Sequence, residues 1–68
     1  MNENEREKEV SRNHDLRNRV HDLTDSVNIE SCQGECFYEE DALQSFLGNL
    51  YELKDASIAY YESNQRLA

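Results

Sequence analysis

Apolar residues recur at helical spacing in two stretches of the chain, and the second stretch is the richer. Between Asp41 and Tyr61, large apolar side chains follow one another at steps of three and four residues, which is the period of a helix face. They form two adjacent rows. The row predicted to form the hairpin core is Leu43, Phe46, Leu50, Leu53 and Tyr60. The second row is Leu47, Tyr51, Ile58 and Tyr61. The pattern predicts a helix over residues 39–64.

The first half of the chain predicts a second helix, over residues 5–28, where there is no glycine or proline. Its apolar positions project within an arc of only about 60°, which suits a single helix–helix contact such as a coiled-coil seam. These core positions are Leu16, Val20, Leu23 and Val27. Asn4 with Glu7 is the predicted N-cap pair, and Ser11 is a later alternative start.

Residues 29–38 interrupt both patterns and contain Gly34, a natural turn residue. Two helices joined by such a connection predict an all-α, antiparallel two-helix hairpin, with residues 1–68 as one domain. If the chain reverses near Gly34, the numbers of paired positions should sum to about 69. That register sets Leu16 against Leu53.

The two predicted helices differ in the width of their apolar faces. The face of the second helix spans about 180°, roughly three times that of the first, so one narrow helix cannot cover it. The row left uncovered marks a binding surface. We therefore expect a homodimer that forms a four-helix bundle, with this row serving the dimer, a target protein or both. The predicted interface residues are Leu47, Tyr51, Ile58 and Tyr61.

Size and charge narrow the class of partner. A chain of 68 residues builds only a marginal core and is usually supported by a disulfide, a metal or a partner subunit. The net charge is −8, and neither half has the cluster of Lys and Arg that phosphate binding requires. We expect no nucleic-acid binding and no attachment to an anionic membrane. An acidic surface fits a basic partner protein, or serves solubility alone.

The location of the protein is also predicted from composition. No apolar run approaches the ~20 residues that span a bilayer, and the charged start lacks a signal-peptide core. We expect the cytoplasm, where cysteines are reduced. Cys32 and Cys36 are spaced as C-x3-C, and His14 and His21 lie about 10 Å apart along one helix, too far to share a metal held by the turn. Free thiols, an intramolecular or intermolecular disulfide, and zinc are the alternatives, and no metal or cofactor is predicted.

The remaining candidate sites, an acidic cluster and a row of tyrosines, are better explained by structural roles than by chemistry. The acidic residues around the turn lack the spacing of a calcium loop and complement the start of the second helix. They are Glu35, Glu39, Glu40 and Asp41. The tyrosines of the second helix lack the basic groove of a base-stacking platform. No nucleophile–base arrangement or phosphate-binding loop is present, so we predict no catalytic residue and no enzyme.

The charged start, the EVSR of Glu9 to Arg12, and two short helices around a glycine turn resemble one group of phage proteins. These are the small helical accessory proteins of lambdoid bacteriophages that are encoded between the exonuclease and excisionase genes. The resemblance covers most of the chain in form. It implies a role in altering the physiology of a bacterial host through protein contacts, and it assigns no catalytic residue.

The sequence therefore favours a non-enzymatic protein–protein interaction module, a phage or mobile-element regulator acting on a bacterial host protein. One alternative is an acidic inhibitor that mimics nucleic acid and occupies a DNA-binding site. Net charge favours it, but the five basic residues spread through the first helix oppose it. Another alternative is a metal or redox module that uses Cys32 and Cys36.

Overall fold

The first helix is longer than predicted at both ends. The computed structural model describes all 68 residues, and α1 spans Glu3–Gln33. Asn2 caps it: its side-chain oxygen accepts from the Glu5 backbone N–H at 2.8 Å, and its amide donates to the Glu5 carboxylate at 3.2 Å. Asn2 and Glu5 thus bond each other twice, and the first of these bonds satisfies a backbone N–H of the first turn. The predicted cap pair of Asn4 and Glu7 was wrong, because the same Asn-x-x-Glu pattern occurs two residues earlier and the earlier copy is used.

The turn is shorter than the predicted segment 29–38, because residues 29–33 contain nothing that stops a helix. Gly34 ends α1 in the left-handed conformation, with φ of 79°, and its N–H donates to the Glu30 carbonyl at 3.2 Å. Only glycine adopts this conformation without strain. A short 3-10 helix, η1, Glu35–Phe37, follows directly. Two extended or irregular residues then lead into the second helix.

The second helix, α2, spans Glu40–Leu67. Its N-cap residue, Glu39, makes no side-chain capping bond, but Glu40 and Asp41 place negative charge in the first turn, where the helix dipole favours it. The helix ends three residues beyond the predicted limit, close to the end of the chain. Nothing between Asn64 and Leu67 breaks helical periodicity, and Arg66 places a positive charge in the last turn, where the dipole favours a cation.

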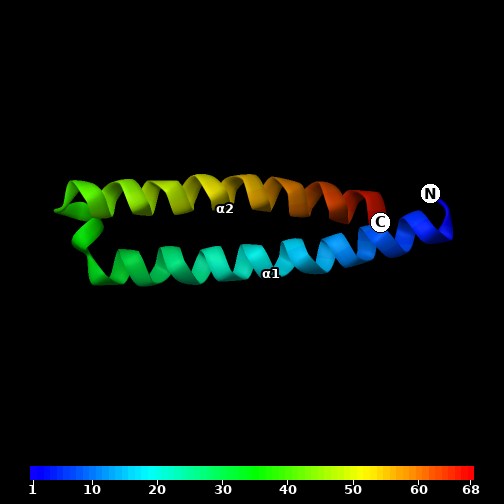
Figure 1. The fold of residues 1–68 in the computed structure, drawn as a ribbon, viewed down its shortest axis with the longest axis horizontal. Helices are drawn as coiled ribbons and strands as arrows, with labels where there is room; N and C mark the ends of the chain where they lie inside the picture. The colour runs from blue at the N-terminus through cyan, green and yellow to red at the C-terminus, as the bar shows by residue number, and fades with distance from the viewer.

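The two helices lie side by side and antiparallel, so the protein is an all-α hairpin shaped as a rod about 51 Å long (Figure 1). The first turns of α1 project past the C-terminal end of α2 and have no helix beside them. Neither helix contains a stretch apolar enough to cross a lipid bilayer.

The contact between the helices is a seam with the seven-residue repeat of a coiled coil. In α1 the less exposed positions follow steps of four and three residues: Glu9, Asn13, Leu16, Val20, Leu23, Val27 and Glu30. In α2 the matching positions are Phe46, Asn49, Leu53, Ala56, Tyr60, Ser63 and Leu67. Most of the apolar predicted core residues thus lie on the seam, whereas Leu43 and Leu50 lie outside it. Polar residues gather toward its two ends: Glu9, Asn13 and Ser63 at the open end, and Glu30 and Asn49 near the turn.

The register differs from the predicted one by about one heptad. Ser63 bonds Glu9 and Asn13, and Asn49 bonds Glu30, so the numbers of paired positions sum to 72, 76 and 79, centred near 76 rather than 69. This register sets Leu16 level with Tyr60, not with Leu53. The predicted register was wrong because α1 continues to Gly34 and η1 is inserted after it, which moves the centre of the turn along the chain. A shift of one heptad keeps the same residues on the seam, so apolar periodicity alone does not distinguish the two registers.

Two features of the core were not predicted. Ala56 and Ser63 are buried in the seam although neither is large and apolar. Leu50, predicted for the core, lies at the exposed edge of α2 with 37% of its surface accessible. The reason is geometric: the seam of α2 passes through Asn49 and Leu53, which turns Leu50 toward the side of the helix.

Candidate functional site

The predicted interface residues lie on the face of α2 that points away from α1. We call Leu47, Tyr51, Ile58 and Tyr61 the outer row. Tyr51 and Tyr61 are about two-thirds exposed, at 67% and 64%; Ile58 is about half exposed and Leu47 is half-buried. Leu50 adjoins them at the edge. The apolar surface of α2 therefore extends around the helix onto its solvent-exposed face.

This outer row occupies positions that are normally polar in a two-stranded coiled coil, because they face away from the partner helix. The equivalent face of α1 follows that rule. Its exposed residues at the same seven-residue positions are Ser11, His14, Asn18, His21, Asp25 and Asn28. The asymmetry between the helices therefore marks the outer row as a surface that folding of the single hairpin does not explain.

Lys54 lies within the outer row, between Tyr51 and Ile58 along the helix, and it is exposed. The hairpin contains two ion pairs, Arg19 with Glu52 and Arg66 with Glu9, and neither involves Lys54. Asp55 is its neighbour in the chain but is not paired with it. The outer row thus carries one unpaired cation beside apolar side chains.

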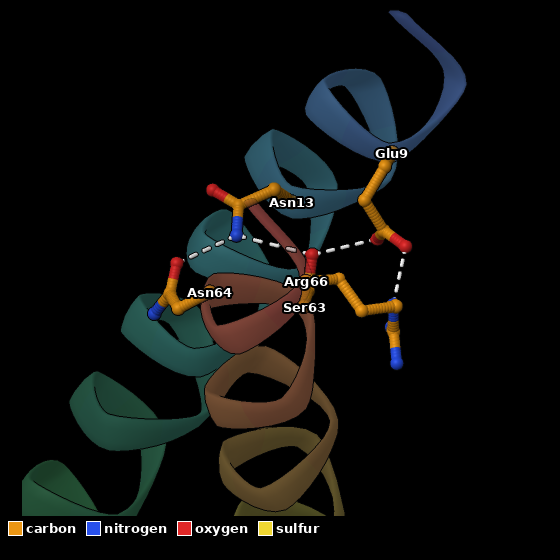
Figure 2. A network of polar contacts seen from close by, with 5 residues as sticks. All are labelled: Glu9, Asn13, Ser63, Asn64 and Arg66. Atoms are coloured by element: carbon orange, nitrogen blue, oxygen red, sulfur yellow. Dashed lines mark hydrogen bonds and ion pairs between the residues drawn. The ribbon is translucent and has the colours of Figure 1, made fainter. Parts of the chain in front are cut away.

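A polar cluster holds the open end of the hairpin together (Figure 2). Ser63 is fully buried; its hydroxyl donates to the Glu9 carboxylate at 2.7 Å and accepts from the Asn13 amide at 3.1 Å. The same amide of Asn13 donates to the Asn64 side chain at 2.7 Å, and the Arg66 Nε donates to Glu9 at 2.5 Å. Because each buried polar group has a partner here, the cluster stabilises one alignment of the helices.

The charge of Glu9 is stabilised by this cluster. The hydrogen bond from Arg66, and then the one from Ser63, hold the pKa of Glu9 below its ordinary value of 4.5, and they outweigh the opposing effect of burial. The Glu9 bond in turn raises the pKa of Arg66 above its ordinary range. The ionised form of Glu9 is therefore the form that the folded hairpin favours.

This shift predicts a pH dependence of stability. A glutamate whose pKa is lowered by folding stabilises the folded state above pH 4.5, and that contribution is lost as the pH falls through the folded-state pKa. Glu9→Gln should lower the melting temperature by a few degrees at pH 7 and by progressively less as the pH falls through the folded-state pKa of Glu9, because the carboxylate is then protonated. Circular dichroism melts of both proteins at pH 7 and at a strongly acidic pH measure this.

The matched control is Glu7→Gln, which removes the same charge from an exposed side chain without a hydrogen-bond partner. It should change the melting temperature little at either pH. If Glu9→Gln behaves like Glu7→Gln at pH 7, the cluster does not stabilise the fold through Glu9.

Sequence reasoning missed the polar cluster, although a signal for it exists. Glu9 and Asn13 continue the seven-residue spacing of Leu16 and Val20 toward the N-terminus, and Ser63 continues that of Ala56 and Tyr60 in α2. Extending the seven-residue spacing without regard to side-chain polarity would have placed these three residues in the seam. At the other end of the seam, the Asn49 amide donates to the Glu30 carboxylate at 2.5 Å in the same way.

The two cysteines differ in their surroundings and are both free thiols. Cys32 is exposed on α1, and Cys36 is buried in η1, where its thiol donates to the Glu30 carbonyl at 3.6 Å. No group of three or more His, Cys, Asp or Glu side chains is arranged to hold a metal ion. The thiol of Cys36 therefore acts in this structure as a packing group that attaches the turn to the end of α1.

No protein-family model, no curated protein and no solved structure matches this chain. The resemblance of its layout to phage accessory proteins stays a prediction. The surfaces of the hairpin carry the functional argument, and the outer row of α2 is the candidate functional site.

Proposed function

We propose that this protein is a non-enzymatic protein–protein interaction module whose outer row binds a helical surface. The first partner proposed is a second copy of the chain, which gives a dimeric four-helix bundle. The observation that carries the proposal is the exposure of Tyr51, Ile58 and Tyr61 along one face of α2. An apolar stripe at this spacing, uncovered in the single hairpin, is the kind of surface that a second helix pair covers.

The outer row is suited to a two-fold contact. Including Lys54, its members follow at steps of four, three, four and three residues, over about 21 Å of helix. If the two α2 helices pack antiparallel about a two-fold axis near Lys54, Tyr51 lies beside Ile58 of the partner subunit. This packing would also bring Lys54 to Asp55 of the partner subunit, which gives the unpaired cation a carboxylate. In such a contact each interaction occurs twice.

In the setting that the resemblance implies, the module would act on a bacterial host protein in the host cytoplasm, as a regulator encoded by a phage or mobile element. The outer row would then serve the dimer, the host target or both. An apolar row that is partly exposed in the monomer allows exchange between these two partners, because each competes for the same side chains.

Sedimentation equilibrium tests the dimer. The native protein should sediment as a dimer at micromolar concentration, and Tyr51→Glu/Ile58→Glu should sediment as a monomer of unchanged helix content. Two carboxylates buried without partners cost several kcal/mol, enough to weaken association at least 100-fold. Circular dichroism of the same samples checks that the hairpin remains folded.

Ser11→Glu/Asn18→Glu is the matched control. It adds two carboxylates with the same seven-residue spacing on the outer face of α1, where both side chains are exposed. This variant should stay a dimer. A native protein that is monomeric throughout the concentration range contradicts the proposed dimer. Dissociation of both variants to the same extent contradicts the assignment of the contact to the outer row.

A further inference from the structure

Net charge is distributed very unevenly along the rod. Residues 20–53, which form the turn half of the hairpin, contain eight of the fifteen acidic residues and none of the seven Lys and Arg residues. The remainder of the chain has seven acidic and seven basic residues. The turn half therefore carries the whole charge of −8, and the open half is neutral. Between charged partners, such a gradient determines which end is attracted first.

The turn end also exposes aromatic side chains. Tyr38 is 91% exposed and Phe37 is 62% exposed. Phe37 ends η1 and Tyr38 follows it, and together with Leu43 and Gln44 they line part of a surface hollow. Tyr38 is too exposed to stabilise the hairpin, and Phe37 keeps most of its surface in solvent. Exposed aromatic residues are frequent anchors of protein interfaces.

The turn that presents these aromatics is well ordered by its contacts. The Phe37 ring packs edge-on against Phe46, with 5.7 Å between ring centroids, and the preceding residue, Cys36, is buried. Backbone bonds from Phe37 to Gly34 and from Tyr38 to Glu35, of 3.1 and 3.0 Å, close η1. The backbone that carries Tyr38 is therefore fixed, which reduces the backbone entropy lost on binding.

Carboxylates flank the aromatic pair along the chain, and two of them, Glu39 and Glu40, line the same hollow. The exposed acidic residues in this segment are Glu35, Glu39, Glu40 and Asp41. Both ion pairs of the hairpin lie elsewhere, so no Lys or Arg of the chain neutralises them. An aromatic centre with an uncompensated anionic rim has the layout of an interface core and rim, and its complement is an apolar recess with a cationic rim.

We propose that the turn end is a second docking surface, which binds a basic protein. Phe37 and Tyr38 enter an apolar recess of that protein, and the flanking carboxylates pair with its Lys and Arg side chains. Charge complementarity selects this class of occupant. The same carboxylates repel nucleic acid and anionic lipid surfaces. The aromatic pair precedes α2, and the outer row begins about two turns into that helix, at Leu47.

Binding of a designed peptide tests the proposal. The probe is a fluorescent amphipathic helix made of lysine and leucine; one comparison peptide replaces lysine with glutamate, and the other replaces leucine with serine. Fluorescence anisotropy at physiological salt should show binding of the first peptide only. Amide chemical shifts of the protein should change in residues 34–44 rather than along the outer row.

Variants separate the two components of this surface. Tyr38→Ser should weaken binding of the lysine–leucine peptide about tenfold, as expected for loss of a central aromatic anchor. Because the Tyr38 side chain is almost fully exposed, the hairpin should keep its melting temperature. Glu39→Gln/Glu40→Gln should weaken binding and reduce its dependence on salt, since two attractive charges are removed.

Two control variants distinguish binding at the turn end from binding elsewhere on the hairpin. Tyr61→Ser removes an equally large aromatic from the outer row, and Glu3→Gln/Glu7→Gln removes two charges from the neutral end. Neither should change the affinity more than twofold. If Tyr61→Ser weakens binding and Tyr38→Ser does not, the peptide occupies the outer row and the turn-end proposal is wrong. If every charge variant has the same effect, attraction is unspecific and the proposal also fails. The sedimentation result for the outer row is independent of both outcomes.

Discussion

Leu23→Ala should remove a large part of the stability of the hairpin. Leu23 is the only large aliphatic residue of α1 that is buried, at the middle of the apolar part of the seam. Removing a buried leucine side chain costs about 2–5 kcal/mol, because the transfer free energy is lost and a cavity remains. A domain of this length has a total stability of roughly 3–10 kcal/mol. Urea unfolding followed by circular dichroism should show a much lower midpoint, with a substantial unfolded fraction even without urea.

Ile29→Ala is the matched control for Leu23→Ala. It removes the same number of carbon atoms from the same helix, but Ile29 is more than half exposed. The free energy of unfolding should change by no more than about 0.5 kcal/mol, and the better helix propensity of alanine favours a small gain. Equal losses for the two variants would contradict the position of Leu23 in the seam.

The helical hairpin was predictable because apolar periodicity identifies a helix face even when the ends of the helix are placed wrongly. Leu16, Val20, Leu23 and Val27 define a helix face wherever the helix begins and ends. The difference between the narrow face of α1 and the wide face of α2 was also visible in the sequence. It located Tyr51 and Tyr61 on the side of α2 away from the seam, which is where the structure has them.

The turn was less predictable because tertiary contacts determine it. Residues 29–38 looked like one loop, yet α1 continues to Gly34 and a 3-10 helix follows. What holds that short helix is the burial of Cys36 and the contact between Phe37 and Phe46, which are separated in sequence. No local pattern encodes such a contact.

The helix register was mispredicted for a different reason, and that reason indicates a role for the polar residues near the ends of the seam. Two registers one heptad apart place nearly the same set of apolar residues on the seam, although in different pairs. In the predicted register Glu9 would lie level with Tyr60 and Asn13 level with Ala56, so both would lose their hydrogen bonds. The observed register gives both of them Ser63. Polar seam residues that select one alignment at some cost in stability are known from coiled coils.

Making the ends of the seam apolar should therefore stabilise the hairpin and relax its register. The first variant, Glu9→Leu/Asn13→Leu/Ser63→Ala, removes the cluster at the open end. The second variant adds Glu30→Leu/Asn49→Leu and removes the polar pair at the turn end. Both should melt several degrees above the native protein, because apolar replacement of buried polar groups is often stabilising. Only the second should populate the shifted register substantially, since the first keeps one polar pair that the shift would break.

Disulfide trapping distinguishes the registers, in a background of Cys32→Ala/Cys36→Ala. The pair Leu16→Cys/Tyr60→Cys closes in the observed register, and Leu16→Cys/Leu53→Cys closes after a shift of one heptad, about 10 Å along the axis. Under mild oxidation, the native seam should trap the first pair alone, and the fully apolar seam should trap both to comparable extents. If the fully apolar seam still traps only the first pair, the length of the turn alone sets the register. The cluster of Glu9, Asn13 and Ser63 would then not select the register.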